Sequence, residues 1–283
     1  MGLFGNSYLK PGPGVSKDEP KKKGIALYFQ MFFRHFWDFM KENMMYVIAS
    51  IPMFVIVYLA VSLLDIFGIQ TWVFENNAIE IYEMFKVFVV LAIIILCGSG
   101  PASAGMAHMM RCVTREEHCF LLSDFVEKFK ENFKHTFLLS LLDILVLTVF
   151  LPVAIKFYYF QYTASQGLHW FVLLVIMVVF AAFYIMMHIY FYQFAITFEL
   201  SFSKTLKNSL IMAVAYLPLN ILIMAIPLVL TYILCSFITT TVVLMFSLFF
   251  WISFMRYPIE FLASRVILNK LLTKNEANEE TTE

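Results

Sequence analysis

The segment "NSLIMAVAYLPLNILIMAIPLVLTYILCSFITTTVVLMFSLFFWISFM", residues 208–255, contains no charged side chain. A membrane-spanning helix needs about 20 mostly apolar residues, so this run is long enough for two passes. The chain of 283 residues is 61% hydrophobic and 14% charged, whereas soluble domains have about 45–50% apolar and about 25% charged residues. The composition therefore predicts an all-α polytopic membrane protein.

Apolar runs upstream of this segment predict four more transmembrane helices, which gives six in total. They also divide the chain into a polar N-terminal segment (1–24), a six-helix transmembrane domain (25–272) and a polar tail (273–283) whose composition predicts disorder. The predicted spans are about 43–64, 87–110, 136–156, 169–198, 209–230 and 235–255.

The distribution of basic residues predicts the orientation of these spans. Eighteen of the 20 Lys and Arg residues lie on one side of the membrane in this topology, and only Lys86 and Lys156 lie on the other. Cytoplasmic loops carry the excess of Lys and Arg, so both termini are predicted to be cytoplasmic. The net charge of zero gives no reason to expect nucleic acid as a partner.

Three similar sequences suggest an internal repeat. "KENMMYVIASIP" from Lys41, "KENFKHTFLLSL" from Lys130 and "KNSLIMAVAYLP" from Lys207 each lead into an odd-numbered span. The segments before the first two carry apolar residues on one helical face, which is typical of helices lying in the membrane interface. We therefore predict three units, each an interfacial helix leading into a hairpin of two spans. The alternative is that any helix start at the inner face favours such residues.

The second span ends in "CGSGPASAGM", residues 97–106, which is rich in small residues and contains one proline. A proline inside a helix removes a backbone hydrogen bond and produces a kink, and small residues let a second helix approach closely. One interpretation is a kinked helix in tight helix–helix contact. The other is a hinge, or exposed carbonyls lining a substrate path. The residues concerned are Gly98, Gly100, Pro101 and Gly105.

The next residues, "RCVTREEHCFLLSDF" (111–125), are abruptly charged. Thr114 and Glu117 have the spacing of a capping box, which predicts that a new helix starts there, and Ser123-Asp124 predicts a further start. The charged side chains then form either a solvated loop or a cytoplasmic surface that contacts a partner. The candidate contact residues are Arg111, Arg115, Glu116, Glu117, His118 and Asp124.

The blocks "GPASAGM", "TREEH" and "SDF", together with the N-terminal "KPGPGVSKDEPKKKG", resemble the YesL-like family of bacterial membrane proteins. The resemblance covers nearly the whole chain, and its most specific part is the block from Gly100 to His118. It implies a multi-pass protein of the bacterial cell membrane with a domain of unknown function. Because family members are commonly encoded beside carbohydrate ABC transporters, it also implies an accessory role in carbohydrate uptake. It supplies no catalytic residues.

No motif for chemistry is found. The sequence lacks a GxxxxGK[ST] phosphate loop, a GxSxG elbow and an HExxH helix. His108, Cys112, His118 and Cys119 include metal-binding residue types, but a zinc site needs convergent ligands, and the predicted cap at Thr114 separates the two pairs. We therefore predict no enzyme activity, no cofactor and no metal site.

Asp143 is the one acid well inside a predicted span. Intramembrane acids are costly and often functional, although nearby water or a Lys partner at the inner end of the span would make a structural role equally reasonable. His188 and Asn220, in neighbouring spans, are the candidate partners. Arg256 and Glu260 have the i, i+4 spacing of a helical ion pair at the inner boundary.

Three functions fit these observations. The first is an accessory subunit, without chemistry of its own, that binds the permease subunits of a carbohydrate ABC importer and also contacts their ATPase. The second is a stand-alone small-solute transporter or channel, which would use the broken second span and Asp143. The third is a membrane sensor that acts on a cytoplasmic regulator.

Overall fold

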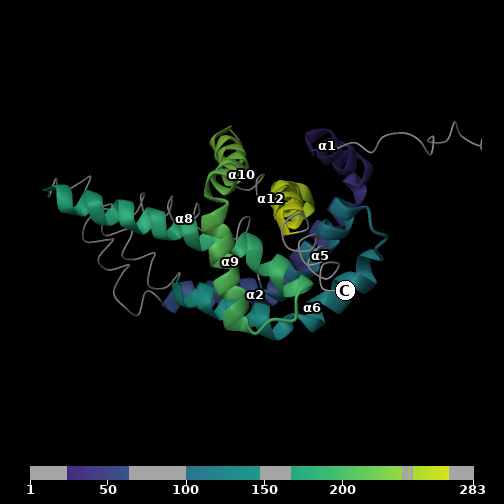
Figure 1. Ribbon diagram of the computed structural model, residues 1–283, viewed down its shortest axis with the longest axis horizontal. Helices are drawn as coiled ribbons and strands as arrows, with labels where there is room; N and C mark the ends of the chain where they lie inside the picture. The colour runs from purple at the N-terminus through teal and green to yellow at the C-terminus, as the bar shows by residue number, and fades with distance from the viewer. Residues whose placement is uncertain (1–23, 64–99, 147–166, 238–241, 243–244, 268–283) are drawn as a thin grey trace, which may run out of the picture.

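The computed structural model describes residues 24–63, 100–146, 167–237, 242 and 245–267. Within these residues every regular element is a helix (Figure 1). The elements are α1 (Gly24–Arg34), α2 (Phe36–Leu63), α5 (Pro101–Arg115), α6 (Leu121–Glu131), a helix over residues 133–146, α8 (Gly167–Thr197), α9 (Phe202–Ala215), α10 (Leu217–Phe237), the π-helical turn η4 (Ser247–Trp251) and α12 (Ile252–Ile267).

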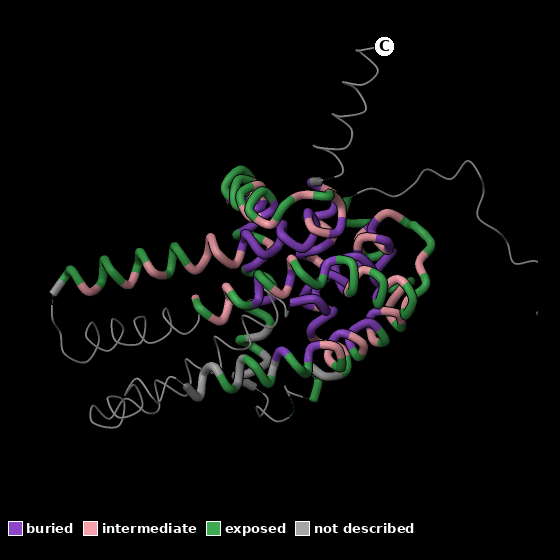
Figure 2. Tube along the Cα trace, turned by 90° about the horizontal axis from the view of Figure 1, so that it is seen from below, coloured by how far each residue is buried: buried purple, intermediate pink, exposed green. Residues whose placement is uncertain are grey.

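The longest helix, α8, has the character of a membrane span. Residues Leu168–Thr197 have a mean hydropathy of 2.7 in their most apolar window, and only 11% of that window is buried. Figure 2 shows the first half of α8 extending away from the buried core, with mostly exposed residues. An apolar helix left uncovered in this way is consistent with contact to lipid, because a soluble protein would bury it.

The six-span topology is supported only in part. By length and composition, the described residues contain one helix that could cross a membrane, or up to two if the bent pair α9–α10 counts as one span. The segment of the predicted span 209–230 is bent, because α9 and α10 meet at 90°. Pro218 is the second residue of α10 and has no N–H to continue the ladder of α9.

Parts of four other predicted spans (43–64, 87–110, 136–156 and 235–255) fall outside the described residues, as do most of the N-terminal segment 1–24 and the tail 273–283. The complete topology and the cytoplasmic termini therefore stay predictions.

A short helix followed by another helix after a single-residue break recurs three times. The break residues are His35 between α1 and α2, Asn132 between α6 and the helix over 133–146, and Tyr216 between α9 and α10. The N–H of each break residue donates to the carbonyl of the residue four positions earlier. The carbonyl of the break residue accepts from the N–H of the residue four positions later. Each break residue thus keeps helical hydrogen bonds to the helix on either side of it.

The lysines that begin the three similar sequences (Lys41, Lys130 and Lys207) do not occupy equivalent positions in these three units. Lys41 follows its break by six residues, whereas Lys130 and Lys207 precede theirs by two and nine. The repeated helix–break–helix arrangement is present among the described residues, but its alignment on the lysines is wrong. The second spans of the first and third hairpins (87–110 and 235–255) extend outside the described residues, whereas that of the second hairpin (169–198) corresponds to α8.

Helix α5 lies at the centre of the packed core. Every residue from Pro101 to Met110 is buried, because α2, α6, α8 and α12 all pack against this helix. Its many alanine, glycine and serine side chains permit these close approaches. Figure 2 shows the buried residues gathered around this part of the molecule.

Candidate functional site

A half-open pocket of about 520 Å³ lies where the α1–α2 break meets the end of α5 and the linker to α6. Four of its lining side chains are carboxylates (Asp38, Glu42, Glu116 and Glu117), whereas its only Lys or Arg is Arg34. Carboxylates thus outnumber basic side chains in this acidic pocket, and two of them are paired outside the lining, Asp38 with Lys41 at 3.3 Å and Glu117 with Arg115 at 3.6 Å. The other lining residues are Met31, His35, Phe39, Met109, Val113, His118, Cys119, Phe120 and Leu121.

The C-terminal end of α5 shapes one wall of this pocket, and it differs from the prediction. Thr114 does not cap a new helix. Its hydroxyl donates to the carbonyl of Met110, at 2.8 Å, inside α5. The helix ends instead at Glu116, whose φ of 60° is left-handed, and Glu117 N–H donates back to the carbonyl of Cys112, at 2.9 Å. This pattern is a Schellman motif with glutamate where glycine is usual.

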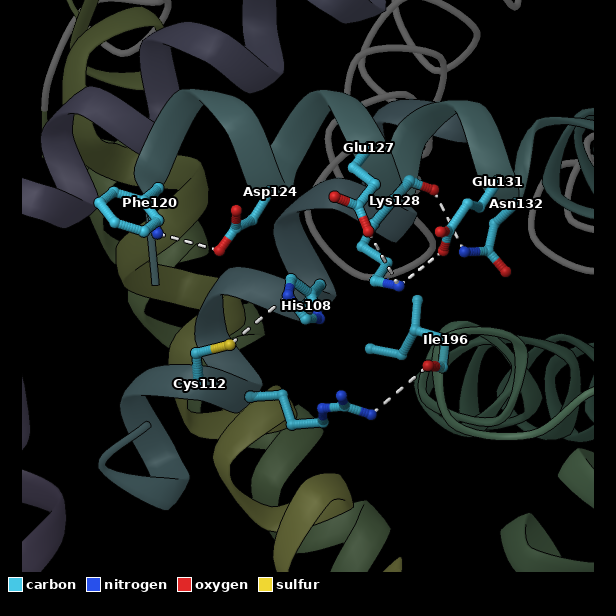
Figure 3. Close-up of polar contacts among 10 residues, drawn as sticks. His108, Cys112, Phe120, Asp124, Glu127, Lys128, Glu131, Asn132 and Ile196 are labelled. Carbon is cyan, nitrogen blue, oxygen red and sulfur yellow. Dashed lines mark hydrogen bonds and ion pairs between the residues drawn. The ribbon is translucent and has the colours of Figure 1, made fainter. Parts of the chain in front are cut away.

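The second predicted helix start is nearly correct. Helix α6 begins at Leu121 rather than at Ser123-Asp124, and the carboxylate of Asp124 accepts from the N–H of Phe120, at 2.9 Å. Figure 3 shows this contact at the first turn of α6. Asp124 thus stabilises the helix start and takes part in the fold.

The other predicted contact residues divide into a buried group and an exposed group. Arg111 is not part of a free surface, because its guanidinium donates to the hydroxyl of Thr197, at 2.9 Å, at the end of α8. Its second contact, to the carbonyl of Ile196, is seen in Figure 3. Arg115 is largely buried and lies 3.6 Å from the carboxylate of Glu117.

Glu116, Glu117 and His118 are the charged or polar residues of the predicted set that stay exposed at the pocket. The His118 ring packs edge-on against Phe120, with centroids 4.9 Å apart. A partner could reach these residues directly, whereas the guanidinium of Arg111 is already bonded to the end of α8.

A buried ionic centre lies beneath the pocket. Arg256 and Glu260 of α12 form the predicted ion pair, at 2.7 Å, and are 2% and 1% exposed. Gln193 of α8 donates to the second oxygen of Glu260, at 2.7 Å, and Arg256 donates to the hydroxyl of Ser103, at 3.1 Å. The pair thus ties α12 to α8 and α5.

Two tyrosine rings and a further acid complete this centre. Arg256 lies 5.8 Å and 5.6 Å from the ring centroids of Tyr46 and Tyr192. Glu42, which is 1% exposed, has a carboxylate oxygen without a hydrogen-bond partner. The sequence indicated the ion pair by its spacing but gave no signal for Glu42, which comes from another helix.

Asp143 has the partner that the sequence suggested. Its carboxylate accepts from His188, at 2.8 Å, and from the hydroxyl of Tyr184, at 2.5 Å. Asn220 is not a partner of Asp143, because its side-chain oxygen accepts from Tyr190 and its amide donates to a backbone carbonyl. The Asp143 group is therefore a satisfied polar cluster between the helix over 133–146 and α8.

Cys112 and Cys119 lie together with His108, contrary to the expected separation by a helix start at Thr114. Candidate ligand atoms of all three residues lie within 4.8 Å of one another. The neighbouring Cys119 thiol and the His108 ring lower the pKa of Cys112 to about 5, against its ordinary 9.0, although burial opposes this shift. The hydrogen bond with Cys112, together with burial, raises the pKa of Cys119.

The small residues of the second predicted span have two structural roles. Gly100 has a φ of 56° and caps α5, and Pro101 is the first residue of that helix, where its missing N–H costs nothing. The expected kink at Pro101 is therefore a helix start. A Cβ on Gly105 would lie 2.7 Å from the ring of Phe125, so this glycine allows α6 to approach α5. Gly98 lies outside the described residues.

One of three comparisons with known proteins gives a match. Residues 39–152 match the family model described as "Protein of unknown function, DUF624". No curated protein and no solved structure matches the chain. The matched segment includes α5, α6, the group of His108, Cys112 and Cys119, and most of the pocket. It does not reach Arg256 or His188. The wider resemblance to the YesL-like family stays a prediction.

Proposed function

We propose that this protein is a non-enzymatic accessory subunit of a carbohydrate ABC importer, and that its acidic pocket receives a basic segment on the cytoplasmic side of the permease. The observation that carries the proposal is the pocket itself, with four carboxylates and one arginine. The charge distribution of the sequence predicts that this end of α5 faces the cytoplasm, where a permease presents its own Lys- and Arg-rich loops.

The rim of the pocket favours such a contact. Phe120 is 68% exposed there, beside His118, and the carboxylate of Glu116 is exposed as well. Exposed aromatic side chains beside charged groups are typical of binding sites for Lys or Arg, because the ring face also attracts a cation.

Charge reversal at the rim tests this proposal. We expect E116K/E117K to reduce the permease captured by the tagged protein in mild detergent about tenfold or more, because like charges opposed across an interface cost several kcal/mol. The control is E127K/E131K, which changes two exposed carboxylates of α6 outside the pocket lining and should leave capture unchanged.

The wild-type result decides the proposal first. If no permease or ATPase subunit is captured under conditions that keep the importer assembled, the accessory role is wrong. Capture of a kinase or transcriptional regulator in place of the importer would instead favour a membrane sensor.

A second candidate function is a small-solute transporter, and the cluster of Asp143, His188 and Tyr184 favours it. Ionisable groups paired within apolar helices are found on ion and proton paths. If the protein transports, we expect Asp143→Asn to abolish solute flux into proteoliposomes, since the amide cannot carry the charge. Glu199→Gln, an exposed carboxylate after α8, is the control that should retain flux. Absence of flux by the wild-type protein would exclude this function.

A further inference from the structure

Three side chains with metal-binding atoms converge where α5 ends. His108 and Cys112 lie one turn apart on α5, and Cys119 returns to them from the linker before α6. The Schellman motif at Glu116 turns the chain back, which places a residue eleven positions after His108 beside it. Figure 3 shows His108 and Cys112 on the side of α5 that faces α6.

The spacing of these atoms fits a tetrahedral zinc ion. Zinc binds histidine nitrogen at about 2.0–2.1 Å and cysteine sulfur at about 2.3 Å, so two such ligands lie about 3.6 Å apart around a tetrahedron. The observed distance between His108 Nε2 and Cys112 Sγ is 3.6 Å. Two zinc-bound sulfurs lie about 3.8 Å apart by the same geometry, which is within the 4.8 Å that bounds the cluster.

The three side chains are largely shielded from solvent and contact one another. His108 is 9% exposed, and its Nδ1 has no hydrogen-bond partner. The Cys119 sulfur contacts the thioether of Met109, at 3.4 Å, and also interacts with the Cys112 thiol and the Asp124 carboxylate. Sulfur and imidazole ligands together favour a thiophilic metal.

We propose that His108, Cys112 and Cys119 bind one zinc ion. The three protein ligands leave a fourth position, as in zinc sites that accept water or an external ligand. Cys119 and Met109 both line the acidic pocket, so the ion has a path of entry from it. The ion would join α5 to its linker and fix the segment that carries Glu116 and Glu117. The proposal concerns the isolated protein and does not depend on an importer partner.

Metal titration of the full-length protein, purified in detergent under reducing conditions, tests the site. We expect one Zn²⁺ per chain, and with Co²⁺ as a spectroscopic substitute, the near-ultraviolet absorption of cobalt–thiolate bonds. Cys112→Ser and Cys119→Ser should each weaken Zn²⁺ binding more than about 100-fold, because even changes around metal ligands cost about 10–100-fold. The matched controls are Cys97→Ser and Cys235→Ser, which remove the other two cysteines and should leave binding unchanged.

A second measurement on the wild-type protein avoids any folding defect of the variants. Bound Zn²⁺ should protect Cys112 and Cys119 from alkylation, as located by mass spectrometry, more than it protects Cys97 and Cys235. Failure to bind Zn²⁺ at one per chain, or equal effects of all four cysteine substitutions, would overturn the site. A cysteine variant that loses Zn²⁺ binding but still captures the importer would show that the zinc site and the proposed docking function are separate.

Discussion

Arg256→Met is expected to lower the free energy of unfolding by about 3–5 kcal/mol, the range found when one partner of a buried ion pair is removed. Glu260 is 1% exposed and would keep its charge without the guanidinium that lies 2.7 Å away. Ser103 would lose a donor and the faces of Tyr46 and Tyr192 would lose their cation. The effect should appear as a shift in equilibrium unfolding of the detergent-solubilised protein by SDS.

Two comparison variants show whether burial causes this loss. Lys128→Met removes an exposed ion pair of α6, to Glu131 at 2.6 Å, and should cost less than about 1 kcal/mol. The double variant R256M/E260M removes both buried charges and should recover at least half of the loss, because two apolar side chains leave no buried charge unpaired. If R256M is as harmless as K128M, the buried ion pair does not hold α12 to the core.

Phe125→Ala is expected to cost about 3–5 kcal/mol of unfolding free energy, the usual range for removing a buried phenylalanine. Phe125 is 3% exposed, and its ring fills the space over Gly105 that brings α6 onto α5. Truncation leaves a cavity that α5 cannot close, because that helix also packs against α2, α8 and α12. The same SDS titration measures the change.

Leu122→Ala is the matched control for this substitution. Leu122 lies on the same helix as Phe125 but is 66% exposed, so its truncation removes little packing and should change stability by less than about 0.5 kcal/mol. A cost for Leu122→Ala as large as that for Phe125→Ala would indicate that the exposed face of α6 is covered by something other than solvent or lipid.

Local signals in the sequence predicted several contacts correctly. The i, i+4 spacing of Arg256 and Glu260 indicated an ion pair that the structure confirms. Asp143 stood out because an acid inside an apolar run needs a partner, and His188 is that partner. Such pairs can be inferred because each depends on helical spacing or on the cost of burying one charge.

Contacts between distant helices carried no comparable signal. Gln193 and Ser103 come from two different helices and bond to the Arg256–Glu260 pair only because α5, α8 and α12 pack together. Thr114 was misread for a related reason. A threonine three residues before a glutamate fits a helix start, but it equally fits the inside of a helix in which the hydroxyl donates to the preceding turn.

The sequence by itself determined that the protein is helical and strongly apolar, because hydropathy and the spacing of apolar residues depend on the local chain. It also located the break at Gly100-Pro101, where glycine and proline restrict the backbone directly. Only the tertiary structure decided that α9 and α10 turn by 90°, and that Cys119 returns to His108 and Cys112. Both depend on where a helix ends and which neighbour it then meets, and that choice is made by packing across the whole fold.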